Sequence, residues 1–262
     1  MVFWKRKKES QIWDAIEGGD VARVAQMLDG KEEIDHADER GRTPLTWAAA
    51  HGQYAVAKLL LDRGANVHHR SPTTGACALG FASMQGHAEL VTLLLDRGAD
   101  VDAYAARFRK AHLSLRLGSI VSLDALNLPM NPDTPGRPVK MAVPLVLAAE
   151  KGHVRTMIVL LSRGADIDAR VESGETAIVQ AAQEGRLEAV RVLLDEGANI
   201  NSTADDGSSA LTRAAEYGHL EIVLLLLANR ADVKQLAAGS SARRHAEHNG
   251  HWSIVKALDQ HH

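Results

Sequence analysis

The chain has 262 residues, a formal net charge of −3 and few aromatic residues: four Trp, three Tyr and three Phe. A slightly acidic chain argues against non-specific nucleic-acid binding, which requires a basic surface. The single cysteine, Cys77, excludes an intramolecular disulfide, and no apolar run reaches the ~18 residues of a transmembrane segment. We therefore expect a cytoplasmic protein without a nucleic-acid partner.

Residues 1–9 are predicted to form a basic N-terminal tail. Phe3 and Trp4 precede a cluster of four basic residues at positions 5–8, and no apolar segment of a secretory signal follows. The tail is expected to be solvated. The alternative is contact with an anionic membrane surface, for which these residues provide only a marginal anchor.

The stretch around Gly41 predicts a pair of short helices. Gly41 suits a turn that needs a positive φ angle. Thr43 is placed to cap a helix that begins at Pro44, where a missing N–H costs nothing. Gly52 ends this helix, and a second apolar helix ends at Gly64. A unit of about 33 residues is too thin to bury its own apolar faces, so neighbouring copies are expected.

Further copies of the unit follow along the chain. The turn positions are separated by 34, 66, 33, 33 and 32 residues. Such regular spacing predicts a solenoid in which each repeat contacts its neighbours. The positions equivalent to Gly41 are Gly75, Met141, Gly174, Gly207 and Gly239.

The segment GRTPLTWAAAHG resembles the TPLH-x-A-A-x-x-G motif of the ankyrin-repeat family, although Thr46 replaces the motif histidine. The resemblance implies an all-α fold, an ankyrin-repeat solenoid of stacked helix-turn-helix units joined by hairpin loops. About 7 to 8 repeats are expected, including caps and one degenerate repeat. The predicted repeats in a single domain of residues 10–258 are 10–37 (N-terminal cap), 38–70, 71–103, 104–137, 138–170, 171–203, 204–234 and 235–258 (C-terminal cap), before a tail at 259–262.

The segment 104–137 departs from the repeat pattern. Its length fits one repeat, and residues 123–128 fall in register with the outer helices. We interpret it as a degenerate repeat, with an inserted loop as the alternative. Four prolines between positions 129 and 138 predict a stiff connector, and a polyproline II ligand is the second interpretation of this stretch.

Histidines and other reactive residues show no catalytic or metal-binding pattern. Four histidines follow a glycine at one repeat position, and the family resemblance implies that they bond backbone at the inter-helix turn: His87, His153, His219 and His251. No nucleophile, phosphate-binding or metalloprotease motif is present. We therefore predict a non-enzymatic protein with no cofactor and no metal site.

The resemblance implies that another protein binds to the concave face formed by hairpin tips and inner helices. Trp47, Phe81 and Met84 are expected to be exposed there and to supply the affinity. Basic residues lie towards the N-terminal side and acidic ones towards the C-terminal side. The expected function is a scaffold or adaptor; an inhibitor or immunity protein for one enzyme or toxin is the alternative, and a ligand-binding or catalytic protein a third. The predicted partner-binding residues are Arg40, Arg42, Trp47, His51, Phe81, Met84, Gln85, Arg107, Arg109, Glu150, Glu172, Glu175, Gln180, Glu184, Asp205, Asp206, Arg213, Glu216 and Tyr217.

Overall fold

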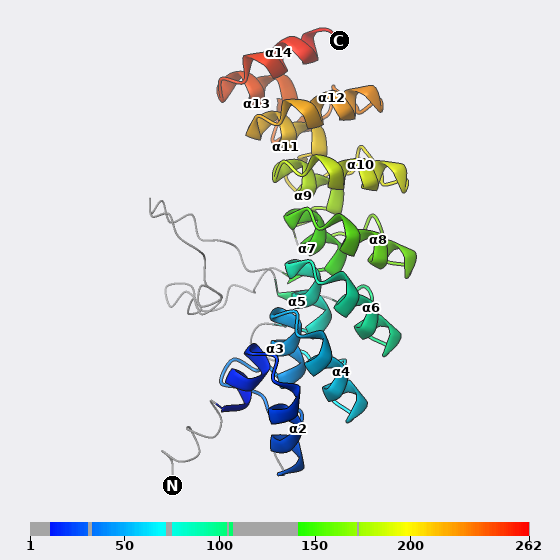
Figure 1. Cartoon of the computed structure of the whole chain (residues 1–262). Helices are drawn as coiled ribbons and strands as arrows, with labels where there is room; N and C mark the ends of the chain where they lie inside the picture. The colour runs from blue at the N-terminus through cyan, green and yellow to red at the C-terminus, as the bar shows by residue number, and fades with distance from the viewer. Residues whose placement is uncertain are drawn as a thin grey trace.

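The computed structural model describes residues 11–30, 33–71, 75–103, 105–106, 141–171 and 173–261. This part of the chain is mostly helical, and its helices form seven pairs stacked into a solenoid (Figure 1). The inner helices are residues 11–17, α3 (Pro44–Ala50), α5 (Ala78–Gln85), α7 (Pro144–Lys151), α9 (Ala177–Gln183), α11 (Ala210–Tyr217) and α13 (Ala242–His248). The outer helices are α2 (Val21–Asp29), α4 (Tyr54–Asp62), α6 (Ala88–Asp96), α8 (Val154–Ser162), α10 (Leu187–Asp195), α12 (Leu220–Ala228) and α14 (Trp252–Asp259). The strands are β1 (Ala105–Ala106), β2 (Met141–Ala142), β3 (Leu236–Ala237) and β4 (Ser240–Ser241). The predicted all-α solenoid is confirmed.

The hydrophobic core is a continuous layer along the stack. Inner helices pack against inner helices of neighbouring pairs, and outer helices against outer ones (Figure 1). Ala48 and Ala49 of α3 are fully buried, and because alanine ends at Cβ, adjacent inner helices approach closely. Leu60 and Leu94 of the outer helices fill the space between the two columns.

Hydroxyl caps begin several inner helices, as the sequence predicts. The Thr43 side chain accepts a hydrogen bond from the Thr46 backbone N–H, and Ser209 and Thr212 form a reciprocal capping box. Thr46 and Thr212 stand where the family motif has histidine, so these hydroxyls support the local helix end. Thr176 is an exception, since its hydroxyl bonds Ser202 at 2.8 Å and does not cap α9.

The pairs on either side of the irregular segment stack directly on one another. α5 packs against α7 and α6 against α8, so no helix pair stands between them. The prediction that a degenerate repeat stacks there in register is therefore wrong. β1 pairs with β2 in antiparallel register, with Ala106 opposite Met141. The remaining expectations for this segment, its loop and its proline connector, lie outside the described residues.

Side chains at the inter-helix turns tie each pair to the preceding one. The Nε2 atom of His153 donates to the Met84 carbonyl at 3.1 Å, and that of His219 to the Gln183 carbonyl at 3.0 Å. Arg186 makes the same kind of bond at its own junction. The structural role implied for these histidines is confirmed.

The C-terminal pair ends the stack with a polar surface. Arg243 of α13 forms ion pairs with Glu247 and with Asp259 of α14, and Arg244 is exposed to solvent. Charged residues on a side of a repeat that faces no other helix keep that side soluble, as in a capping repeat.

The partly buried junction histidines His87 and His153 should make stability sensitive to pH. Burial lowers the pKa of His87 and of His153 below the ordinary value of 6.5. As pH falls below about 6.5, these histidines are protonated in the unfolded chain before they are protonated in the folded one. The free energy of unfolding therefore decreases as the pH is lowered further. We expect urea unfolding at pH 5.5 to show lower stability than at pH 7.5.

A matched variant isolates the contribution of these two side chains. Gln53 occupies the same junction position near the N-terminus and donates to the Glu17 carbonyl at 2.7 Å, so glutamine can replace histidine there. The double variant His87→Gln, His153→Gln should lose less stability over this pH range. An equal loss in both proteins would show that other groups cause the pH dependence.

Candidate functional site

The C-terminal ends of the inner helices present one row of side chains along the stack, which face solvent except for His51, whose side chain is 7% exposed. We call this row, together with the partly exposed residues one turn earlier, the inner-helix face. Its residues differ from repeat to repeat, whereas the buried alanines behind them recur. The inner-helix face comprises Trp47, His51, Gln85, Glu150, Lys151, Glu184, Arg213, Glu216 and Tyr217.

Trp47 forms the centre of an aromatic cluster at the N-terminal end of this face. The Arg42 guanidinium lies 4.1 Å from its ring centroid, and Trp13 contacts it edge-on at 6.0 Å. The ring of His51 lies 4.7 Å away and bonds the Trp47 carbonyl through Nδ1. Arg42 is also paired with Asp38 at 2.6 Å. Trp47 is thus partly covered by its own chain, with one part of the ring accessible.

Phe81 and Met84 are not exposed, and the prediction that they form surface anchors is wrong. Phe81 is 5% exposed and Met84 is also buried. Phe81 occupies the same repeat position as Trp47 and lies on α5, which packs against both α3 and α7.

Arg213 of α11 organises the polar part of the face. It pairs with Asp206 at 2.7 Å and with Glu216 at 3.1 Å, and Glu175 of the preceding repeat lies 4.0 Å away. Burial alone would raise the pKa of Asp206, but hydrogen bonds from Ser208 and Arg213 hold it below its usual value. One guanidinium therefore holds together carboxylates from two repeats.

Two predicted surface residues in this region are buried. Glu175 is 5% exposed and accepts a hydrogen bond from the Ser173 hydroxyl at 2.9 Å, while Gln180 is only 1% exposed. Because both side chains are buried, they cannot contact a partner directly. The prediction that Glu175 and Gln180 are exposed is therefore wrong.

Charges on the face are more evenly balanced than the sequence indicates. Asp205 pairs with Arg170 at 3.1 Å, and Glu150 pairs with Lys151 at 2.8 Å. Arg42 in the N-terminal half forms an ion pair with Asp38. These contacts reduce the predicted separation of basic and acidic halves. Three predicted site residues, Arg107, Arg109 and Glu172, lie outside the described residues.

Sequence reasoning missed the most exposed large hydrophobic side chain in the described chain, Trp252 at 65%. It begins α14 and has the same repeat position as Tyr54, which is also exposed. Aligning the outer helices by register as carefully as the inner ones would have identified both residues.

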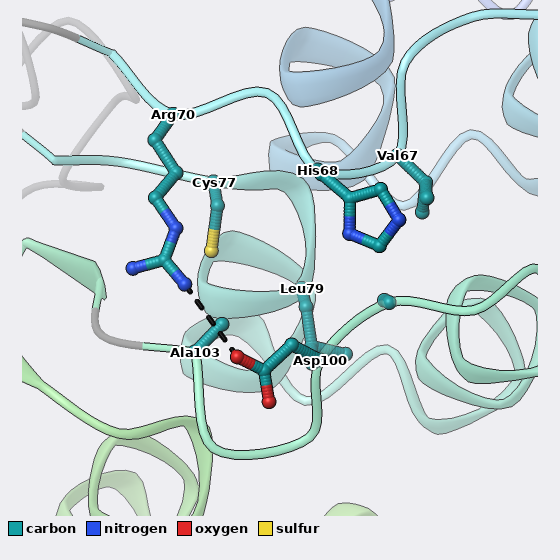
Figure 2. A pocket seen from close by; sticks show the side chains of 8 residues that line it. Val67, His68, Arg70, Cys77, Leu79, Asp100 and Ala103 are labelled. Carbon is teal, nitrogen blue, oxygen red and sulfur yellow. Dashed lines mark ion pairs between the residues drawn. The ribbon is translucent and has the colours of Figure 1, made fainter.

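A small pocket lies between two neighbouring hairpins (Figure 2). Arg70 and Asp100 form an ion pair at 3.7 Å across it, and the Cys77 side chain lines its wall. The pocket has a volume of about 90 Å³, below the roughly 300 Å³ at which ligand pockets begin. Burial raises the pKa of the Cys77 thiol, which keeps it protonated and unreactive at neutral pH.

The described residues contain neither a metal-binding cluster nor a membrane-spanning helix. No group of three or more His, Cys, Asp or Glu side chains is arranged to hold a metal ion. None of the helices combines the length and the apolar character needed to span a bilayer.

Comparison with known proteins identifies the repeats. The family model described as "Ankyrin repeats (3 copies)" matches residues 12–105 and 145–237, which is more than half of the chain. Ankyrin repeat family A protein 2 of Homo sapiens is 48% identical over 48 residues, covering 18% of this chain and 15% of that protein. Palmitoyltransferase akr1 of Aspergillus oryzae is 47% identical over 51 residues, covering 19% of this chain and 7% of that protein. The chain thus spans less than a fifth of either relative.

A solved structure supports the same assignment for the fold. The human ASB11 ankyrin repeat domain is similar with a TM-score of 0.73 at 23% sequence identity, covering 94% of this chain and 96% of that one. The chain therefore belongs to the ankyrin-repeat family, whose repeats are protein–protein interaction modules.

Proposed function

We propose that this protein is a non-enzymatic adaptor that binds a partner protein through the inner-helix face. The observation that carries the proposal is the contrast between constant and variable positions. Ala48 and Ala49 recur as Ala181 and Ala182 in the core, whereas the exposed residues beside them differ in size, charge and polarity. A scaffold with a constant core and a varied surface is suited to recognising one particular protein surface.

The polar contacts on the face favour selective recognition. Arg213 is held by three carboxylates and Arg42 is held against Trp47, so these side chains are ordered before a partner arrives. An ordered surface loses less side-chain entropy on binding. Trp47 is the aromatic residue best placed to act as an anchor in the N-terminal half of the face.

Photo-crosslinking tests which side of the solenoid binds. A photoreactive phenylalanine analogue would replace Gln85 or Lys151 on the inner-helix face, and Ile158 or Leu224 on the outer helices, where both side chains are exposed. We expect one protein to be captured from cells of the source organism at the inner positions alone. Capture solely at the outer positions would place the interface on the other side and refute the proposal.

The stoichiometry and effect of the captured protein separate two versions of this function. An adaptor is expected to leave any activity of its partner intact. A dedicated inhibitor or immunity protein would instead form an equimolar complex and block one enzyme or toxin. Either mode is compatible with binding at the inner-helix face, and an activity assay on the captured partner distinguishes them.

A further inference from the structure

Two exposed aromatic side chains belong to neighbouring helix pairs at the C-terminal end of the stack. Tyr217 ends α11 and is 50% exposed, and Trp252 begins α14 in the next pair. The intervening junction is fixed, because the Nε2 atom of His251 donates to the Glu216 carbonyl at 3.2 Å. A Cβ atom at Gly218 would lie 2.7 Å from the His251 ring, so the two turns are in close contact. Tyr217 and Trp252 therefore flank one packed junction.

Carboxylates accompany these aromatic residues. Glu184 occupies the position of Tyr217 in the preceding repeat, and the two helices that carry them, α9 and α11, pack together. Glu184 is exposed, and its carboxylate accepts a hydrogen bond from the Gln183 amide at 3.2 Å. Within the described chain, no cation lies at ion-pair distance from Glu184. This carboxylate is therefore available to a cation from outside.

The neighbouring arginines are already engaged elsewhere. Arg186 directs its Nε atom towards the Glu150 carbonyl of the preceding pair at 3.1 Å. Arg213 is shared between the carboxylates of Asp206 and Glu216. Neither arginine forms an ion pair with Glu184. Glu216 already binds the guanidinium of Arg213, as carboxylates commonly do with arginine. Glu184 is therefore the carboxylate of this group that has no ion-pair partner within the described residues.

We define the acidic aromatic edge as Glu184, Glu216, Tyr217 and Trp252. Exposed Trp and Tyr rings attract cations over their faces, and nearby carboxylates strengthen this preference and steer a charged segment to the surface. We propose that this edge binds a segment of the partner protein that is rich in arginine or lysine. The inference rests on the proposed function and adds the chemistry of the segment that the partner presents.

A peptide titration tests this preference directly. The probe is a short peptide in which Arg alternates with Gly and Ser, and the comparison peptide carries Glu in place of Arg. With ¹⁵N-labelled full-length protein, we expect the Arg peptide to shift the Trp252 indole N–H signal and the backbone signals of Tyr217 and Glu184. The Glu peptide should leave them in place, and added salt should weaken the Arg peptide.

Variants distinguish the edge from general attraction to an acidic protein. Trp252→Ala and Tyr217→Ala should each weaken the Arg peptide roughly five- to tenfold, and Glu184→Gln should weaken it mainly at low salt. Tyr54→Ala is the matched control, since Tyr54 has the same repeat position as Trp252 and is 43% exposed at the other end of the stack. It should bind the peptide as well as the unmodified protein.

The outcomes separate this inference from the proposed function. Signal changes away from the edge, equal weakening by Tyr54→Ala, or equal binding of the Glu peptide would overturn the inference. In that case, capture of one protein by crosslinking from Gln85 would still support the adaptor function. Failure of that capture would refute the adaptor function whatever the peptide result.

Discussion

Replacing Gly86 by alanine should strongly destabilise the protein. Gly86 caps α5 with a φ angle of +81°, and a Cβ atom there would lie 2.6 Å from Nδ1 of His153. The His153 ring cannot move away without losing its bond to the Met84 carbonyl. We expect a loss of roughly 3 kcal/mol in the free energy of unfolding, from backbone strain and steric overlap together.

A second glycine separates these two causes. Gly98 has a φ angle of +87°, but no heavy atom lies within 4 Å of the place where a Cβ atom would be. Gly98→Ala should therefore cost only about 1 kcal/mol, the strain of the left-handed conformation. Urea unfolding followed by circular dichroism measures both variants. In a His153→Ala background, Gly86→Ala should cost no more than Gly98→Ala; an unchanged cost would show that the ring is not the obstacle.

Loss of Arg213 is the second change expected to have a large effect. Arg213→Ala removes the cation shared by Asp206, Glu216 and the buried Glu175. Carboxylates gathered in a partly buried site repel one another, so we expect a loss of roughly 3 kcal/mol at pH 7. The loss should shrink towards pH 4, because protonation of the carboxylates removes the repulsion.

Arg170→Ala provides the control for this prediction. Arg170 pairs with Asp205 on an exposed part of the surface. Such a pair contributes at most about 1 kcal/mol. Thermal and urea unfolding of both variants at pH 7 and pH 4 measure the difference. A loss for Arg213→Ala that is as small as that for Arg170→Ala, or that does not depend on pH, would contradict the idea that Arg213 neutralises a carboxylate cluster.

The repeat register made the fold and its internal contacts predictable from the sequence. Gly41, Thr43 and Gly52 have the turn and cap roles that their residue types indicate, and His153 and His219 bond backbone as the family resemblance implies. These features depend on local geometry that recurs in every repeat. The same residue pattern therefore appears several times within one sequence.

Burial on the inner-helix face could not be predicted in the same way. Register places Trp47, Phe81 and Gln180 at one position, yet Trp47 is partly exposed and the other two are buried. Exposure there depends on which side chains the adjacent repeats contribute. Ion pairing has the same origin, since Arg213 meets Glu175 from another repeat. Both are properties of pairs of residues distant in sequence.

The antiparallel pairing of β1 and β2 makes the length of the intervening chain nearly irrelevant to the stack. Ala106 and Met141 are held opposite each other, and the repeats on both sides contact each other directly. Closing a connection between two such fixed points costs entropy that grows only with the logarithm of its length, about 0.6 kcal/mol for each doubling. The solenoid should therefore tolerate large changes in the length and sequence of the segment between β1 and β2. A reporter or an additional binding module could be inserted there while the rest of the molecule keeps its geometry.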